Sequence, residues 1–142
     1  MKTLKKSILT LSFLFAACLF VNAGVAGKAG KSANDVLTKY IENTTTGQSH
    51  DFSEILGDDF KQFVDCDKSR LNFNKKQFMS YLKICKDVVY NCTAKYSLVE
   101  NSEDVVIAKV DMKFPTFTKT NYVTLSNTNE GWKITSISVK YS

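Results

Sequence analysis

The sequence predicts an α+β protein in which helices cover one face of an antiparallel sheet. Apolar residues recur at helical spacing between Ser32 and Cys85, and from Val88 onwards the period changes to two. The links between the four predicted strands are short, and short links join antiparallel neighbours. Helices followed by a run of strands are typical of α+β folds.

The first 23 residues have the pattern of a secretory signal peptide. Lys2, Lys5 and Lys6 precede an uncharged run from Ile8 to Val21, and this pattern is typical of export signals. Small residues at Val21 and Ala23 favour cleavage after Ala23. We therefore expect a signal peptide at 1–23, a flexible tether at 24–31 and one domain at 32–142, in a periplasmic or secreted protein.

Two alternatives for this segment stay open. One is an uncleaved N-terminal anchor, although the apolar run is short for a membrane span. The other is a lipoprotein, because Phe15-Ala16-Ala17-Cys18 resembles a bacterial lipoprotein signal and a lipid on Cys18 would hold the protein at a membrane. Phe15 in place of the usual leucine, and the apolar residues after Cys18, favour simple cleavage.

Charge and metal-ligand content argue against several classes of function. The chain has 19 basic and 14 acidic residues, and removal of the signal peptide leaves 16 against 14. The lysines are scattered and Arg70 is the only arginine, so the clustered basic face of a nucleic-acid-binding protein is missing. With one histidine and no zinc-like cysteine spacing, we expect neither a metal nor another cofactor.

Three cysteines would remain after cleavage. Cys66 and Cys85 flank a predicted helix and are a possible disulfide pair in an oxidising compartment. Cys92 lies on the apolar face of a predicted strand, where a cysteine usually acts as a small buried hydrophobe.

Three helices are predicted ahead of the sheet. Ser32 or Asn34 caps the first, which ends at Gly47. A shorter second helix runs from Asp51 or Ser53 to Gly57, and residues 58–67 are irregular or a short strand. Asn74 caps the third helix. The predicted buried positions of the first and third helices are Val36, Leu37, Tyr40 and Ile41, and Phe78, Tyr81, Leu82 and Cys85.

Four strands follow from their alternating patterns. The first runs from Val88 to Leu98, and the second carries the inward face Val106 to Phe114. Pro115 cannot donate to a strand ladder and predicts a bend before Phe117. The last two strands are expected at residues 117–126 and 132–141.

This order resembles the nuclear transport factor 2-like (cystatin-like) fold, a cone of three N-terminal helices packed on a curved antiparallel sheet. Lys39-Tyr40-Ile41-Glu42, Gly47 and Leu56-Gly57-Asp58-Asp59 are similar to the ketosteroid isomerase, SnoaL-like and lumazine-binding branch. The resemblance covers Ala33 to Ser142 and implies a secreted bacterial member of that superfamily.

The resemblance also implies where isomerase groups would lie. Tyr40 falls at the oxyanion tyrosine, but Val64 occupies the position of the catalytic aspartate and Thr124 that of the second acid. Asp65 is adjacent to Val64 but points to the opposite face of a strand. A valine cannot accept the substrate proton, so we expect no isomerase activity. His50 is interpreted as a solvated loop residue, and Asp58 and Asp59 as turn residues.

Three functions from different classes stay open. The first is a non-catalytic domain that binds a small hydrophobic or aromatic ligand in the cone, although the same aromatic residues are consistent with plain core packing. The second is a homodimer formed through an open sheet face, and the third is an unrecognised isomerase or lyase. The predicted ligand-binding residues are Tyr40, Tyr81, Tyr96, Met112, Tyr122 and Trp132, and the predicted dimer surface is Val105, Ile107, Val123 and Leu125.

Overall fold

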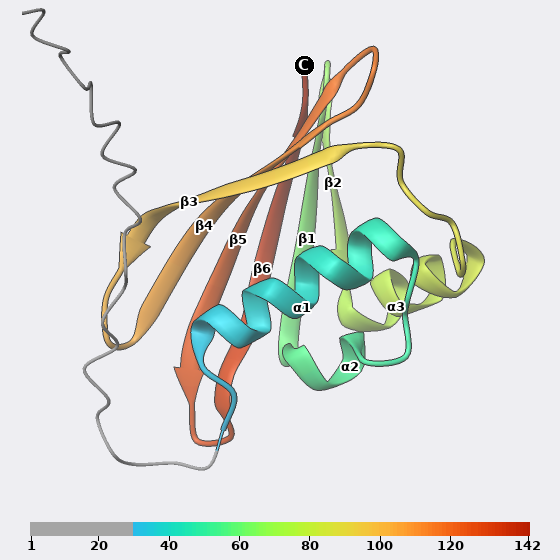
Figure 1. The fold of residues 1–142 in the computed structure, drawn as a ribbon. Helices are drawn as coiled ribbons and strands as arrows, with labels where there is room; N and C mark the ends of the chain where they lie inside the picture. Colours follow the sequence, from blue (N-terminus) through green and yellow to red (C-terminus); the bar gives the residue numbers. More distant parts are fainter. Residues whose placement is uncertain (1–29) are drawn as a thin grey trace, which may run out of the picture.

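One curved six-stranded sheet, covered on its concave face by helices, forms the domain (Figure 1). The computed structural model describes residues 30–142, so the predicted signal peptide and most of the tether lie outside the described part of the chain. The helices are α1 (Ala33–Thr46), α2 (Phe52–Ile55) and α3 (Lys75–Ile84). The strands are β1 (Leu56–Cys66), β2 (Ser69–Asn74), β3 (Thr93–Asn101), β4 (Val105–Lys113), β5 (Thr118–Thr128) and β6 (Gly131–Tyr141).

The strands are arranged in the order β2-β1-β6-β5-β4-β3. Every neighbouring pair is antiparallel except β1 and β6, which run parallel, with Val64 beside Val139. The β1–β2 turn, the β4–β5 turn and the C-terminus all lie at one end of the sheet, at the top of Figure 1. We call this the open end.

The prediction of three helices followed by four strands was wrong in two respects. The second helix, α2, is a single turn of four residues, so the structure has two substantial helices. A β-hairpin, β1 and β2, is inserted between α2 and α3, where the sequence suggested irregular chain or one short strand. The α+β class itself is confirmed, because α1 and α3 cover a mainly antiparallel sheet.

The first predicted strand also begins later than expected. Residues 88–92 form a loop, and β3 starts at Thr93, opposite the last residue of β4, Lys113. Beyond Lys113 the chain turns through Pro115, where the Phe114 N–H donates to the Phe117 carbonyl. The alternating stretch from Val88 to Cys92 therefore has no partner strand.

The helix boundaries follow from their capping residues. Ser32 accepts a hydrogen bond from the Asp35 N–H, and the Asp35 carboxylate accepts one from the Ser32 N–H, which completes a capping box. Asn74 and Gln77 form the same arrangement at α3. Gly47 ends α1 in the left-handed conformation at φ 69°, where glycine carries no steric penalty.

A continuous apolar core fills the space between the helices and the sheet. Tyr40 and Phe78 both pack edge-on against Phe52 at the centre. The fully buried strand residues facing them include Val110, Met112, Val123, Leu125 and Ile137. This packing corrects the proposed dimer surface, because Val123 and Leu125 belong to the core and only Val105 and Ile107 lie towards the opposite face.

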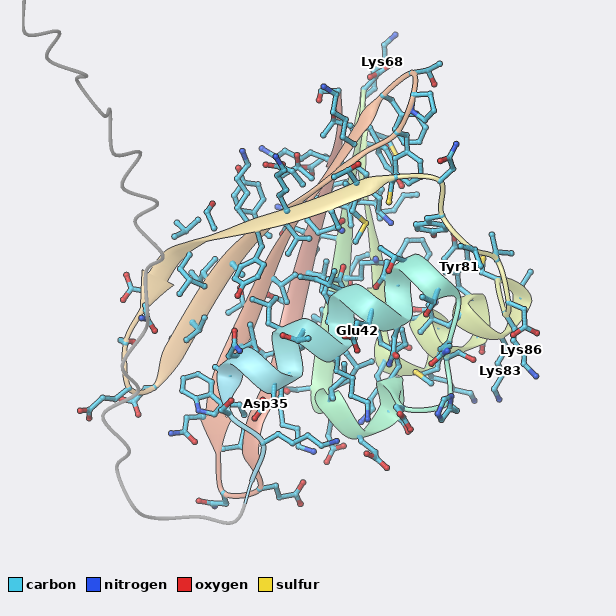
Figure 2. All side chains as sticks on the ribbon, viewed as in Figure 1. Asp35, Glu42, Lys68, Tyr81, Lys83 and Lys86 are labelled. Atoms are coloured by element: carbon cyan, nitrogen blue, oxygen red, sulfur yellow. The ribbon has the colours of Figure 1, made fainter. Side chains whose placement is uncertain are left out.

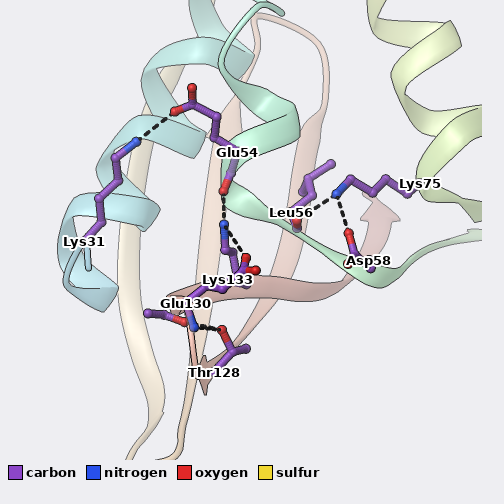
Figure 3. A network of polar contacts seen from close by, with 9 residues as sticks. Lys31, Glu54, Leu56, Asp58, Lys75, Thr128, Glu130 and Lys133 are labelled. Atoms are coloured by element: carbon purple, nitrogen blue, oxygen red, sulfur yellow. Dashed lines mark hydrogen bonds and ion pairs between the residues drawn. The ribbon is translucent and has the colours of Figure 1, made fainter. Parts of the chain in front are cut away.

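Lysines tie α2 to the strands next to it (Figure 3). Lys133 donates to the Glu54 carbonyl, and Lys31 forms an ion pair with the Glu54 carboxylate at 3.2 Å. Lys75 donates to the Leu56 carbonyl at 3.0 Å, at the start of β1. These bonds hold the short α2 turn at the end of the domain away from the open end. Within residues 30–142, no helix has both the length and the apolar character of a membrane span.

Candidate ligand site at the open end of the sheet

The six residues predicted to bind a ligand do not converge on one place. Tyr40 is buried on α1, Met112 is buried on β4, and Tyr81 is 53% exposed on α3. These three border the open end. The other three lie elsewhere, so the six side chains do not form one site.

Tyr96, Tyr122 and Trp132 occupy separate positions. The Tyr96 hydroxyl donates to Asn34 at 3.1 Å, beside the start of α1. Tyr122 pairs across the sheet with Lys109 and Ser138 on its convex face, since its neighbours in β5 are both buried in the core. Trp132 packs partly against the core beside the β5–β6 turn.

A loop from Cys85 to Cys92 connects α3 to β3 and lies against the end of α1 (Figure 1). Its Asp87 N–H donates to the Gly47 carbonyl at 3.0 Å, and its Tyr90 N–H donates to the Thr45 carbonyl at 2.8 Å. These two bonds hold the loop against the last turn of α1. Gly47 permits this contact, since a Cβ there would lie 2.6 Å from the Val88 nitrogen.

Polar groups gather behind this loop. The phenols of Tyr90 and Tyr141 raise the pKa of Tyr40, and the thiols of Cys85 and Cys92 act on the pKa of Lys119. Figure 2 shows Tyr81 between α3 and the end of α1, facing the same region. We call this group the mouth cluster; its members are Tyr40, Tyr81, Tyr90, Tyr141, Cys85, Cys92 and Lys119.

Aromatic rings form a string along the rim of the same region. The ring centroids of Tyr90 and Phe114 are 5.6 Å apart, and Phe114 stacks on Phe117 at 4.5 Å with 12° between the ring planes. Phe117 then meets Tyr141 at 6.1 Å. Phe117 is 41% exposed and Tyr141 56% exposed, so this rim offers aromatic surface to a ligand.

Burial disfavours the charged forms of several groups in the mouth cluster. It raises the pKa values of the Tyr40, Tyr90 and Tyr141 phenols and of the Cys92 thiol. Burial also lowers the pKa of Lys119, against the opposing influence of the two thiols. The Lys119 ammonium lies 5.8 Å from the centroid of the Tyr90 ring, where a weak cation–π attraction partly compensates for lost water.

A small cavity adjoins the cluster between the end of α1, α2 and the loop. Its volume is about 20 Å³, which is room for one water molecule. Cys85, Val88 and Tyr90 line it, as does Asn43, whose buried Nδ2 has no partner among the described residues. A planar ring system does not fit inside this cavity, so the exposed rim is the better candidate for ligand contact.

The two positions that the resemblance assigns to isomerase acids, Val64 and Thr124, lie on opposite faces of the sheet. Val64 packs against the core from β1, and Asp65 points to the opposite face, where it pairs with Arg70 at 3.3 Å. Thr124 lies on the convex face beside Ile107 and Ser136, away from the core, because both its neighbours in β5 are buried. Of these three side chains, only that of Val64 faces the concave side.

The remaining candidate groups are exposed or unpaired. His50 is 71% exposed and contacts Asp51, which also pairs with Lys39 at 2.9 Å. Cys66, Cys85 and Cys92 are all free thiols in this structure. The disulfide between Cys66 and Cys85 stays a prediction. The part of the chain that the structure describes brings no three acidic, histidine or cysteine side chains into a metal-binding group.

Sequence reasoning missed Lys119 and Asn121 as members of the site. Both lie on the concave side of β5, in line with the buried Val123 and Leu125. Polar residues at two positions of an otherwise apolar face were the available signal. The raised pKa values of the neighbouring phenols depend on tertiary contacts, so no sequence pattern indicated them.

One protein family matches most of the chain. The profile of a family described as "Putative lumazine-binding" matches residues 28–138. No curated protein sequence matches the chain.

Solved structures share the fold at low sequence identity. A nuclear transport factor 2-like protein from Silicibacter pomeroyi is 14% identical, with a TM-score of 0.64 over 77% of this chain and 92% of its own. A similar protein from Shewanella baltica is 17% identical, with a TM-score of 0.60 over 77% and 90%. A protein from Parabacteroides distasonis, described as a putative ketosteroid isomerase, is 10% identical, with a TM-score of 0.58 over 75% and 85%.

Proposed function

Because the chain belongs to the "Putative lumazine-binding" family within the nuclear transport factor 2-like superfamily, we propose that it is a non-catalytic binding domain for a small planar aromatic ligand. The observation that carries this proposal is the aromatic rim at the open end, where Phe117 and Tyr141 expose ring surface next to the mouth cluster. Stacking on such rings contributes about 0.5–1.5 kcal/mol per pair beyond area burial. The export signal expected at 1–23 would place this domain in the periplasm or outside the cell.

A direct binding experiment tests the proposal. Lumazine, the compound in the family description, is titrated into ¹⁵N-labelled protein spanning residues 24–142, and amide shifts are followed. We expect the largest shifts at Phe117 and Tyr141, and small shifts at Trp132 beside the β5–β6 turn. Saturating shifts confined to the convex face, or none at millimolar lumazine and at millimolar 2-naphthoate, would refute the proposed site.

A matched pair of variants localises the contact. Phe117→Ala removes a ring that is 41% exposed and is expected to weaken binding with little loss of stability. Tyr96→Ala removes a ring of similar exposure (45%) on β3, away from the rim, and is expected to leave binding unchanged. The reverse result would assign the site to the face near Asn34.

A second candidate function is proton-transfer chemistry with Lys119 as the base. It is favoured by one observation, the lowered pKa of a lysine on the concave side of the sheet. Binding without reaction is preferred, because the pKa values of the surrounding phenols rise and none of the acidic residues or histidine of the described chain joins the mouth cluster. Recovery of an added ligand unchanged, measured by mass spectrometry after prolonged incubation, separates the two.

A further inference from the structure

Lys119 is a cation without a partner of opposite charge. It lies on the concave side of β5, between Met112 of β4 and Tyr141 of β6. Among residues 30–142 it forms no ion pair with a carboxylate, and its charge is close only to an aromatic ring and two thiols. Taking an ammonium group out of water without a counter-ion costs free energy, and an incoming anion offsets part of that cost.

A second polar side chain beside Lys119 is also incompletely satisfied. Asn121 is fully buried two residues further along the same face. Its Oδ1 has no hydrogen-bond partner, and its Nδ2 contacts only the Met112 sulfur at 3.8 Å, which is a weak acceptor. Buried amides normally have strong partners, so this one is available to a polar group that enters beside Lys119.

The open end and the adjoining end of α3 carry an excess of basic side chains. Seven basic and three acidic side chains lie in residues 65–70, 81–92, 112–119 and 139–142. The rest of residues 30–142 carries eight basic and eleven acidic ones. Figure 2 shows Lys68 at the tip of the β1–β2 turn, and Lys83 and Lys86 at the end of α3. Such a one-sided field raises the local concentration of anionic ligands. The seven basic residues are Lys68, Arg70, Lys83, Lys86, Lys113, Lys119 and Lys140.

We propose that Lys119 and Asn121 form an anion anchor, and that the natural ligand is therefore a small aromatic acid. Its ring lies against Phe117 and Tyr141, its carboxylate accepts a charge-assisted hydrogen bond from Lys119, and the Asn121 amide donates to the same carboxylate after a half-turn of its side chain. This inference rests on the proposed function and names the class of ligand for that site.

The test uses three probes of the same size and different charge: 2-naphthoate, neutral 2-naphthamide and cationic 2-naphthylmethylamine. Isothermal titration of protein spanning residues 24–142 measures their affinities. A charge-assisted hydrogen bond predicts that 2-naphthoate binds roughly ten- to a hundredfold more tightly than the amide. The amine is expected to bind most weakly, because it adds a second cation beside Lys119.

Variants then separate anchoring from a structural role. Lys119→Met keeps the length of the side chain and removes its charge, so the advantage of 2-naphthoate over 2-naphthamide should disappear. Lys119→Arg should retain most of it. Asn121→Leu keeps the branched shape of the buried side chain and should reduce the preference for 2-naphthoate severalfold. A Lys119→Met variant that weakens both probes equally would indicate a structural effect and overturn the proposal.

The pH dependence gives an independent readout. Anion binding favours the charged amine, so 2-naphthoate affinity should fall as pH rises through the lowered pKa of Lys119, while 2-naphthamide affinity stays level. Equal affinities for acid and amide, with shifts still centred on Phe117, would refute the anchor and leave the aromatic site intact. If no naphthalene probe binds and lumazine does not bind, the proposed function itself fails.

Discussion

Substituting Gly47 by alanine should detach the loop from Cys85 to Cys92 and destabilise the domain. Gly47 adopts φ 69°, and an added Cβ would lie 2.6 Å from the Val88 nitrogen and 2.7 Å from its oxygen. Both contacts are with backbone atoms, so relief requires the loop to move. Movement would break the bonds from Asp87 to Gly47 and from Tyr90 to Thr45.

The magnitude follows from these separate effects. A left-handed conformation costs a residue with a Cβ about 1–2 kcal/mol, and each lost backbone hydrogen bond costs about 1 kcal/mol. We therefore expect Gly47→Ala to lower the free energy of unfolding by about 3 kcal/mol. For a domain of this size that corresponds to a fall in Tm of roughly 10 °C.

Gly57→Ala is the matched control. Gly57 has an ordinary φ, and a Cβ there would meet only the flexible Asp59 carboxylate at 3.1 Å and two atoms beyond 3.4 Å. Thermal unfolding of both variants, with hydrogen exchange of the Tyr90 amide, forms the assay. Equal losses of stability in the two variants, or unchanged protection of Tyr90 in Gly47→Ala, would refute this account of the loop.

Two further predictions concern the core. Phe52→Ala should lower the free energy of unfolding by about 3–5 kcal/mol, because Phe52 is fully buried between Tyr40 and Phe78. A urea titration measures this loss, and a loss below about 1 kcal/mol would contradict the packing. The pKa of Tyr40 is raised above its ordinary value of 10.0 in the folded state, chiefly by burial. The unfolded state therefore loses this proton first, so stability should decline as pH rises above 10, and Tyr40→Phe should flatten that decline in a pH series of unfolding curves.

The parts of the fold that the sequence predicts best are those where burial alternates regularly. In β4, residues 106–112 alternate between buried and half-buried positions, and the prediction matches the strand. In β1 the pattern fails, because Phe63 points to the convex face, where Arg70 covers its ring at 4.6 Å. The hairpin partner β2 is mostly exposed, so hydrophobic periodicity gives little sign of it.

The opposite error, a strand predicted where the chain forms a loop, arose at Val88 and Val89. The alternation of Val88, Tyr90 and Cys92 predicts a strand, yet Val88 and Val89 are 49% and 72% exposed and lie in the loop. A strand needs a partner as well as a pattern, and β4 ends at Lys113 before it can pair with them. For the candidate site, the aromatic content was visible in the sequence. The convergence of Tyr90, Tyr141 and Lys119 depends on the pairing of β5 with β6 and on the loop before β3 lying against the end of α1, which periodicity alone does not specify.

The parallel pairing of β1 with β6 has a consequence for how the chain reaches its folded state. It joins positions far apart in the sequence, such as Leu56 and Ile134, and it places the last strand in the middle of the sheet. During synthesis, β1 and β2 can form only an isolated hairpin until Gly131–Tyr141 has left the ribosome. Contacts of such long sequence separation slow folding. Loss of residues 131–142, which include all of β6, would thus divide the sheet in two, whereas loss of an edge strand such as β2 would only narrow it.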